Sequence, residues 1–166
     1  MNEILKGINQ ENANYICGFV DGEGSFNISF KIRRDYKQKI KLTASFNISQ
    51  KELNILTWIK SLLHCGTIRA RSDGVYYYEV TSLQALLDII IPFFETYYLK
   101  TKKLQAFSIF KKIVDMMKNH EHLKKEGILK IYDLRDTVKV ARQRKFSRAY
   151  LESILNFFGI VASVIF

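Results

Sequence analysis

One acidic residue early in the sequence stands where it could take part in catalysis. Glu23 lies between Gly22 and Gly24, after a mainly apolar stretch and before a strongly basic one. If the basic stretch binds a polyanion, a carboxylate at its edge would repel phosphate unless a divalent cation lay between them, and oxygen ligands suit Mg²⁺. Taken alone, an Asp-Gly-Glu-Gly run often forms only a turn. Its position between two such different segments leads us to predict a metal-dependent phosphodiester site.

The segment before Glu23 is predicted to be a helix, from about residue 11 to residue 23. Its bulky side chains, such as Tyr15 and Phe19, stand apart from a stripe of small or short ones. Small residues spaced by three or four allow a second helix to approach closely. The two glycines at the end are expected to break the helix and turn the chain into a strand. The stripe consists of Asn14, Cys17, Gly18 and Asp21.

Residues 24–49 are predicted to form a two-stranded antiparallel hairpin with one buried face. Apolar side chains stand at every second position from Phe26 to Ile32 and again from Ile40 to Ile48. Such alternation is typical of a half-buried strand. A two-stranded ribbon fits the major groove of DNA, where Arg and Lys suit guanine and Asn suits adenine. The predicted DNA-binding residues of this hairpin are Asn27, Ser29, Lys31, Arg33, Lys39, Lys41, Thr43, Ser45 and Asn47.

A second hairpin is predicted at about residues 67–81, around the turn signal Ser72-Asp73-Gly74. Most half-buried sheets have a solvated polar face, which is the alternative interpretation of the open face. The excess of cations over both hairpins favours DNA instead. A further basic run near residues 139–148 is typical of phosphate contacts, with solvated helix ends as the alternative. The predicted contacts of the second hairpin and the basic run are Arg69, Arg71, Tyr77, Glu79, Arg142, Arg144 and Lys145.

The composition favours a nucleic-acid partner. The chain has 166 residues, 48% of them hydrophobic, and its 26 Lys and Arg against 16 Asp and Glu give a net charge of +10. This hydrophobic content is typical of a folded chain rather than a disordered one, and the charge favours a polyanion partner, nucleic acid before membrane. Two cysteines and three histidines argue against a disulfide framework or a Cys/His metal cluster. We expect no membrane span, transit peptide or secretory signal.

Helices are expected to cover one face of the sheet. A period of 3.6 marks residues 52–63, 83–91 and 104–117, and it returns more weakly over 127–140 and 147–157. Helices and hairpins therefore alternate, and no Gly/Ser-rich linker interrupts them. The sequence predicts an α+β fold, in one domain over residues 1–166, with C-terminal helices at about 100–158.

The segment from Tyr15 to Phe26 resembles the signature of the LAGLIDADG homing endonucleases. The likeness extends to the alternating hairpin, to Ile48-Ser49-Gln50, to Ile91-Pro92-Phe93-Phe94 and to the lysine-rich segment 99–103. The late basic run 142–145 also fits. The signature occurs once, so the chain is similar to the single-motif branch, in which two chains pair. The resemblance implies an αββαββα domain whose curved antiparallel sheet forms a DNA-binding saddle.

The resemblance also implies roles for individual residues. Two signature helices would pack across a two-fold axis through the small stripe and bring both Glu23 side chains close to it. Each Glu23 would bind Mg²⁺ or Mn²⁺, with the Gly22 carbonyl as a further ligand, and Ca²⁺ could occupy the same site. Gln50 and Lys102 match positions that flank the cleavage pocket. Alignment on the residues after the two lysines favours Lys102 over its neighbour Lys103.

The function implied by the resemblance is that of a sequence-specific homing endonuclease. It would be a homodimer that makes a staggered double-strand cut in a long pseudo-palindromic DNA site by Mg²⁺-dependent hydrolysis of phosphodiester bonds. Relatives can instead act as maturases, which bind host intron RNA without cutting DNA, and a basic structural protein is a third interpretation. The presence of Glu23, Gln50 and Lys102 together favours the enzyme. Because organelle introns are a common home of the family, we expect a mitochondrial or chloroplast location.

Overall fold

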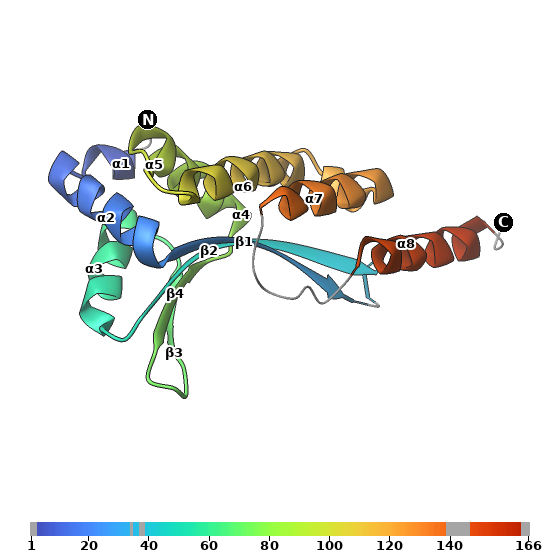
Figure 1. Ribbon diagram of the computed structural model, residues 1–166, viewed down its shortest axis with the longest axis horizontal. Helices are drawn as coiled ribbons and strands as arrows, with labels where there is room; N and C mark the ends of the chain where they lie inside the picture. Colours follow the sequence, from blue (N-terminus) through green and yellow to red (C-terminus); the bar gives the residue numbers. More distant parts are fainter. Residues whose placement is uncertain (1–2, 34, 37–38, 139–146, 164–166) are drawn as a thin grey trace.

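The protein folds as a curved antiparallel sheet with helices on one side. The computed structural model describes residues 3–33, 35–36, 39–138 and 147–163. Figure 1 shows strands β1 and β2 forming an arch beneath α5, α6 and α7, with β3 and β4 extending away from it. The elements are α1 (Glu3–Lys6), α2 (Gln10–Glu23), β1 (Gly24–Ile32), β2 (Ile40–Gln50), α3 (Leu53–Leu63), β3 (Thr67–Ala70), β4 (Tyr76–Val80), α4 (Leu83–Ala85), η1 (Leu86–Ile90), α5 (Ile91–Thr96), α6 (Lys103–Lys118), η2 (Glu121–Leu123), α7 (Lys125–Thr137) and α8 (Arg148–Ser163).

The sheet has the strand order β1-β2-β4-β3, and every neighbouring pair is antiparallel. In the first hairpin the register runs from Gly24 opposite Ile48 to Ile32 opposite Ile40. Side chains of successive residues point to opposite faces of a strand, so the even-numbered apolar residues share the helix-covered face. The odd-numbered polar and basic residues share the open one. The antiparallel hairpin predicted from the sequence is confirmed, and so is the α+β fold class.

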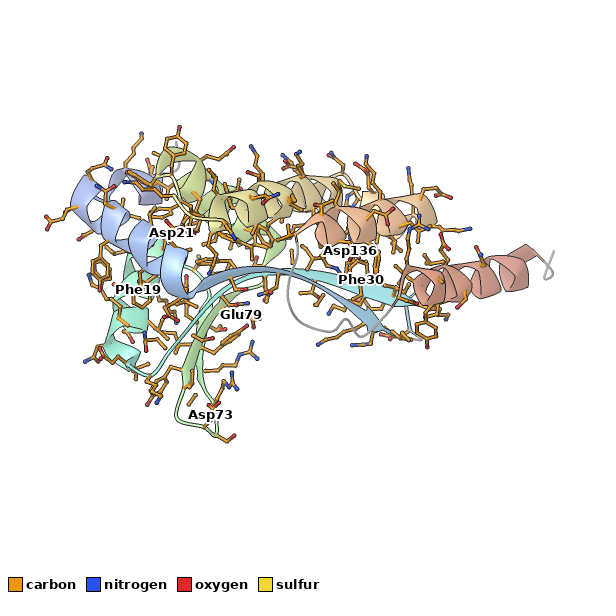
Figure 2. All side chains as sticks on the ribbon, viewed as in Figure 1. Phe19, Asp21, Phe30, Asp73, Glu79 and Asp136 are labelled. Atoms are coloured by element: carbon orange, nitrogen blue, oxygen red, sulfur yellow. The ribbon has the colours of Figure 1, made fainter. Side chains whose placement is uncertain are left out.

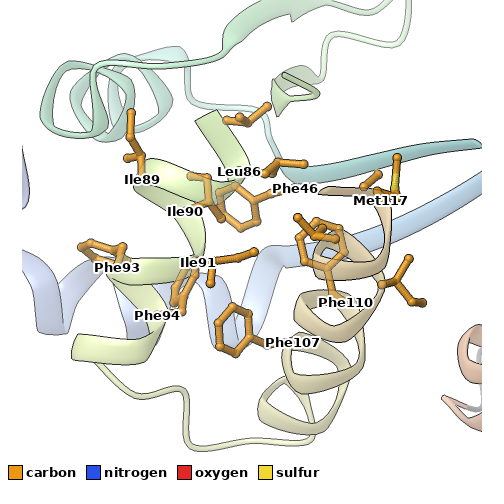
Figure 3. Close-up of a cluster of buried hydrophobic side chains, with 14 of the residues drawn as sticks. Phe46, Leu86, Ile89, Ile90, Ile91, Phe93, Phe94, Phe107, Phe110 and Met117 are labelled. Carbon is orange, nitrogen blue, oxygen red and sulfur yellow. The ribbon is translucent and has the colours of Figure 1, made fainter. Parts of the chain in front are cut away.

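An aromatic cluster joins the sheet to the helices that cover it. Phe26 of β1 lies 5.3 Å from the ring of Phe46 on β2 and 5.3 Å from that of Phe110 on α6, measured between ring centroids. Phe94 of α5 and Phe107 of α6 complete the cluster, which Figure 3 shows between the strands and the two helices. Burial of several aromatic rings at one point holds the arch against α5 and α6.

Two features differ from the sequence predictions. Helix α1 was not predicted, since its four residues are too few to show a helical period, yet Leu5 within it is only 1% exposed. Ile32 follows the apolar alternation but is 43% exposed, at the end of a strand that is buried nearer its middle. The alternation predicts the face of the sheet on which a side chain lies. Whether that side chain is buried then depends on how far along the strand the helices cover this face.

The C-terminal part contains helix α8, which packs against α7 and in which Leu151 and Leu155 are buried. Arg148 at its start forms ion pairs with Asp133 of α7 and with Glu152 one turn further on. The predicted DNA contacts Arg142, Arg144 and Lys145 lie outside the described residues. None of the described helices is both long and apolar enough to cross a membrane.

Candidate active site and nucleic-acid interface

Helix α2 passes directly into strand β1 at Gly24. Asn9 caps the start of the helix by accepting a hydrogen bond from the Asn12 backbone N–H at 2.8 Å. Gly24 has φ −74° and ψ 159°, an extended conformation that any residue can adopt, so backbone freedom is not the reason for a glycine here. A Cβ at residue 24 would instead lie 2.4 Å from Cγ1 of Val20. Glycine is needed here because the strand leaves the helix so close to its last turn.

Glu23 is the last residue of α2, and its side chain is exposed. The carbonyl groups on either side of it point toward a cation of another element. The Lys103 ammonium group, in the first turn of α6, donates hydrogen bonds to the carbonyl oxygens of Gly24 and, at 3.5 Å, of Gly22. A positive charge is stabilised at the C-terminal end of a helix, where free carbonyl oxygens carry the negative end of the dipole. Oxygen ligands and a bound cation therefore meet beside Glu23.

Asp21 holds the start of α6 against the end of α2. Its carboxylate accepts hydrogen bonds from the Lys100 N–H at 2.8 Å, from the Thr101 hydroxyl at 2.8 Å and from the Thr101 N–H at 3.2 Å. Partial burial opposes ionisation, but these bonds and the nearby Lys103 ammonium together lower the pKa of Asp21. Asp21 was predicted to face a second helix. Its carboxylate is occupied within the chain, where it positions the segment that carries Lys103, and its place at an interface between two helices stays a prediction.

Cys17 is also turned into its own chain. Its thiol is 6% exposed and donates to the Tyr97 carbonyl at 3.2 Å. Burial, and to a smaller degree the Asp21 carboxylate, raises the pKa of the thiol to about 11, so it is protonated and unreactive at neutral pH. Its predicted place on the exposed stripe is wrong, whereas the expectation that it packs rather than reacts agrees with this environment.

The outward stripe of α2 is accordingly narrower than predicted. Asn14 and Gly18 are exposed, and Gly22 lies one turn beyond Gly18. A Cβ at either glycine would meet nothing within 4 Å. Open space over two glycines spaced by four leaves room for a second backbone at close range.

Gln50 lies at the end of β2, in a shallow pocket between α2 and α3. Its side-chain oxygen accepts a hydrogen bond from the Lys51 N–H at 2.7 Å. The ring of Tyr15 lies edge-on to Trp58, with 5.5 Å between centroids, and forms one wall. Helical periodicity on α2 and α3 gave no sign that these aromatic residues share a surface, because the pairing depends on how the two helices cross. The pocket is lined by Tyr15, Phe19, Gln50, Glu52, Asn54, Ile55 and Trp58.

Most predicted DNA contacts lie on the open face, but two of them are covered. Ser45 is 9% exposed and Asn47 only 3%. Both belong to β2, whose side chains are flanked by those of β1 on one side and, at Asn47, of β4 on the other. Asn47 accepts a hydrogen bond from the Asn27 amide at 3.3 Å and donates to the Ser45 hydroxyl at 3.3 Å. Their predicted direct contact with DNA is corrected: they support the exposed Asn27.

Charged side chains dominate the exposed rim of this face. Asn27, Lys31, Arg33, Arg69 and Arg71 are exposed. The remaining predicted contacts are partly buried, and they are Ser29, Lys39, Lys41, Thr43, Tyr77 and Glu79. The described residues contain no group of three or more His, Cys, Asp or Glu side chains able to enclose a metal ion.

A family model, one relative and two solved structures match this chain. A LAGLIDADG endonuclease family model matches residues 16–114, more than half of the chain. Homing endonuclease I-ApeII of Aeropyrum pernix is 27% identical over 150 residues, 86% of this chain and 87% of its own length. The archaeal intron-encoded homing endonuclease I-Vdi141I, complexed with DNA, aligns with a TM-score of 0.83 and 29% identity over 90% of this chain and 98% of its own. I-SmaMI, bound to an uncleaved DNA target in the presence of calcium ions, aligns with a TM-score of 0.77 and 29% identity over 87% of this chain and 49% of its own.

Proposed function

The chain belongs to the LAGLIDADG endonuclease family, and we propose that two copies of it form a homing endonuclease that cuts both strands of a long pseudo-palindromic DNA site. One arrangement carries the proposal: an exposed Glu23 stands at the edge of a polar and basic sheet face, with the Lys103 ammonium on the carbonyls beside it. A carboxylate, oxygen ligands and a cation at the rim of a DNA-binding surface are suited to phosphodiester hydrolysis.

Pairing of two chains is supported by the exposed stripe of α2. Gly18 and Gly22 leave open space on the outward side of the helix that ends in Glu23. A second α2 crossing at this stripe would place the two Glu23 side chains near a common axis. A two-fold axis through the protein would be matched by a nearly palindromic DNA site.

The residues beside Glu23 fit a divalent cation. The donors are all oxygen, and the carbonyls of Gly22 and Gly24 already attract an ammonium group. Mg²⁺ would be held by the Glu23 carboxylate and the Gly22 carbonyl, with Mn²⁺ or Ca²⁺ able to replace it. When bound, the metal would polarise the scissile phosphate and activate a water molecule. The DNA complex of I-SmaMI formed in the presence of calcium ions supports this choice of cation class.

The remaining catalytic work falls to Gln50 and to one lysine. Gln50, in the pocket at the end of β2, would orient the attacking water through its side-chain amide. A lysine would balance the charge that develops on the phosphate. The resemblance assigns this role to Lys102, which is exposed, whereas the geometry favours Lys103 because its ammonium lies beside Glu23. We propose Lys103 as the catalytic lysine, and comparison with Lys102 variants tests it.

The DNA target would be read by the open face of the sheet. Asn27, Lys31, Arg69 and Arg71 are exposed there and provide the donor and acceptor groups that base edges recognise. The related I-Vdi141I is intron-encoded. If this chain is encoded by an intron of an organelle genome, rather than of an archaeal one, it would act in the mitochondrion or chloroplast.

Replacing one carboxylate tests the proposal. The wild-type chain, given Mg²⁺ and a plasmid library from which bound sites have been selected, should linearise the selected plasmids. Glu23→Gln should bind the same sites with affinity within about threefold and cut at least roughly 100-fold more slowly, because it removes a metal ligand and leaves the sheet unchanged.

Glu11→Gln is the matched control, since Glu11 is another exposed acid of α2, near its start. It should cut at the wild-type rate. Undiminished cutting by Glu23→Gln would exclude the proposed site. Tight binding of the wild-type chain to intron RNA, without DNA cleavage, would instead identify a maturase.

A further inference from the structure

Three arginines of the open face each form an ion pair with an acid of their own hairpin. Two of these pairs lie at the hairpin turns, where both partners are exposed. The Arg33 and Asp35 side chains are 50% and 58% exposed, and those of Arg71 and Asp73 are 55% and 50% exposed. Exposed pairs of this kind stabilise a protein little and are easily exchanged for water or phosphate.

The third pair, Arg69 with Glu79, is built differently. Glu79 is 16% exposed, while Arg69 remains 65% exposed. On β4, Glu79 stands opposite Asn47 of β2 and Thr67 of β3, so it has a strand on each side. Arg69 is two residues along β3 from Thr67, and its guanidinium reaches Glu79 diagonally across the two strands. Figure 2 shows Glu79 under the arch of the sheet and Asp73 at the far tip of the hairpin.

The position of Glu79 is unfavourable for simple phosphate binding. A carboxylate on the open face repels DNA, and its ion pair with Arg69 removes one cation from the charge available to phosphates. Its contribution must therefore be something other than affinity. An arginine reads guanine through two parallel hydrogen bonds to O6 and N7, which require a fixed orientation of the guanidinium plane. The Glu79 carboxylate, with a strand on each side, holds one guanidinium nitrogen of Arg69 and so restricts how the guanidinium plane can turn.

We infer that Glu79 is a positioning residue that holds Arg69 to read a guanine in the major groove, once in each half of the DNA site. This inference rests on the proposed function, because it presupposes that the open face binds a specific sequence. The exposed end of Arg69 makes the base contact, and Glu79 acts only through Arg69. Because each chain of the proposed dimer carries one Arg69–Glu79 pair, the DNA target should contain a guanine at two symmetry-related positions.

The test measures base preference at every position of the site, by binding selection and sequencing with the whole chain. Glu79→Gln should lower the preference for guanine at one position in each half-site by about tenfold, because a freely rotating Arg69 no longer offers two aligned donors. Arg69→Lys should weaken the same two positions, since lysine keeps the charge and lacks the planar fork. Both variants should leave the other positions unchanged.

Asp73→Asn is the matched control, because it also removes one negative charge from the same hairpin but from an exposed pair. It should raise overall affinity about as much as Glu79→Gln does, without altering any base preference. An unchanged preference in Glu79→Gln, or an equal change in Asp73→Asn, would overturn the inference while leaving the proposed function intact. A wild-type chain without any sequence preference would overturn both.

Discussion

At the scale of single residues, the site depends on a contact between segments far apart in the chain. Lys103 reaches the carbonyls beside Glu23 because Asp21 binds the backbone of Lys100 and Thr101 just before it. Sequence alone favoured Lys102, since alignment compares types and spacing and does not show which of two adjacent side chains faces a given helix. The direction of Lys103 follows from the hydrogen bonds by which Asp21 holds the segment before α6.

Substitution of the two lysines separates these assignments. Lys103→Met should slow DNA cleavage by about 100-fold, because it removes a cation beside the reacting phosphate. Lys102→Met should slow cleavage by no more than about threefold. Single-turnover cleavage of a selected site, with enzyme in excess, gives both rates, and a filter-binding measurement shows whether affinity is retained. The opposite order of effects would return the catalytic role to Lys102.

Asp21 should contribute to stability in a pH-dependent way. Its pKa is lowered in the folded chain from the ordinary value of 3.8, so its stabilisation is present above that value and is lost as the pH falls through the folded pKa. Asp21→Asn should reduce the free energy of unfolding by about 1 kcal/mol at pH 7, a figure discounted for partial exposure. The difference should shrink below about pH 4.

Urea unfolding at pH 7 and pH 3.5 measures this difference. Asp73→Asn provides the comparison, because Asp73 lies in an exposed ion pair at a hairpin turn. It should change stability by less than about 0.5 kcal/mol at either pH. A pH-independent loss in Asp21→Asn would show that the charge of Asp21 is not what holds α6 in place.

At the scale of elements, helix α2 and the residue that follows it contain two glycines with opposite requirements. Gly24 is confined by Val20 within its own chain, whereas Gly18 faces open space. The sequence predicted a role for the terminal glycines at the end of the helix and for the stripe in pairing of two helices. The predicted stripe, however, included both exposed residues and residues that point into the chain. Cys17 and Asn14 are three residues apart, yet one faces Tyr97 and the other faces solvent.

Substitution at these glycines should separate assembly from folding. Gly18→Leu should leave the chain folded, with a gain of up to about 1 kcal/mol in helix propensity, and should prevent pairing of two α2 helices. Gly24→Ala should destabilise each chain by about 1–3 kcal/mol, because its Cβ overlaps Val20. Sedimentation analysis reports the mass in solution, and thermal unfolding reports stability. A Gly18→Leu chain that remained dimeric would place the interface elsewhere.

The sequence predicted well those elements whose hydrophobic pattern depends only on which of their faces is covered. Apolar and polar residues alternate along β1 and β2 because helices cover one face of the hairpin. This pattern can be recognised without knowing which other strands pair with them. The burial of Asn47 depends on β1 and β4 lying on either side of β2, and no local sequence pattern shows the strand order. The shared surface of Tyr15 and Trp58 was missed for the same reason, since it depends on the crossing of α2 and α3.

At the scale of the whole molecule, charge and curvature combine. The net charge of +10 is a property of the sequence. Whether that charge can bind DNA depends on the arched sheet, one face of which has no covering helix over the described residues. Lysine and arginine side chains on that face can approach several phosphates of one DNA duplex together.

DNA binding should therefore depend steeply on salt. If about six phosphates are contacted, the logarithm of the association constant should fall with the logarithm of salt concentration with a slope of about −5, roughly a thousandfold loss between 50 and 200 mM. Fluorescence anisotropy with a selected duplex measures the slope. A response close to flat would contradict the role given to the basic face, whatever the outcome for Glu23.

The hydrogen-bonded series Asn27–Asn47–Ser45 has a consequence for how this protein could change its target. Under the proposed function Asn27 contacts the DNA, whereas Asn47 and Ser45, which support it, are buried. A substitution of Asn27 alone would leave Asn47 and Ser45 positioned for an asparagine that is no longer there. Adaptation to a new sequence at this point would proceed through coordinated replacements. A laboratory library that randomises positions 27, 45 and 47 together should yield more new specificities than one that varies position 27 by itself.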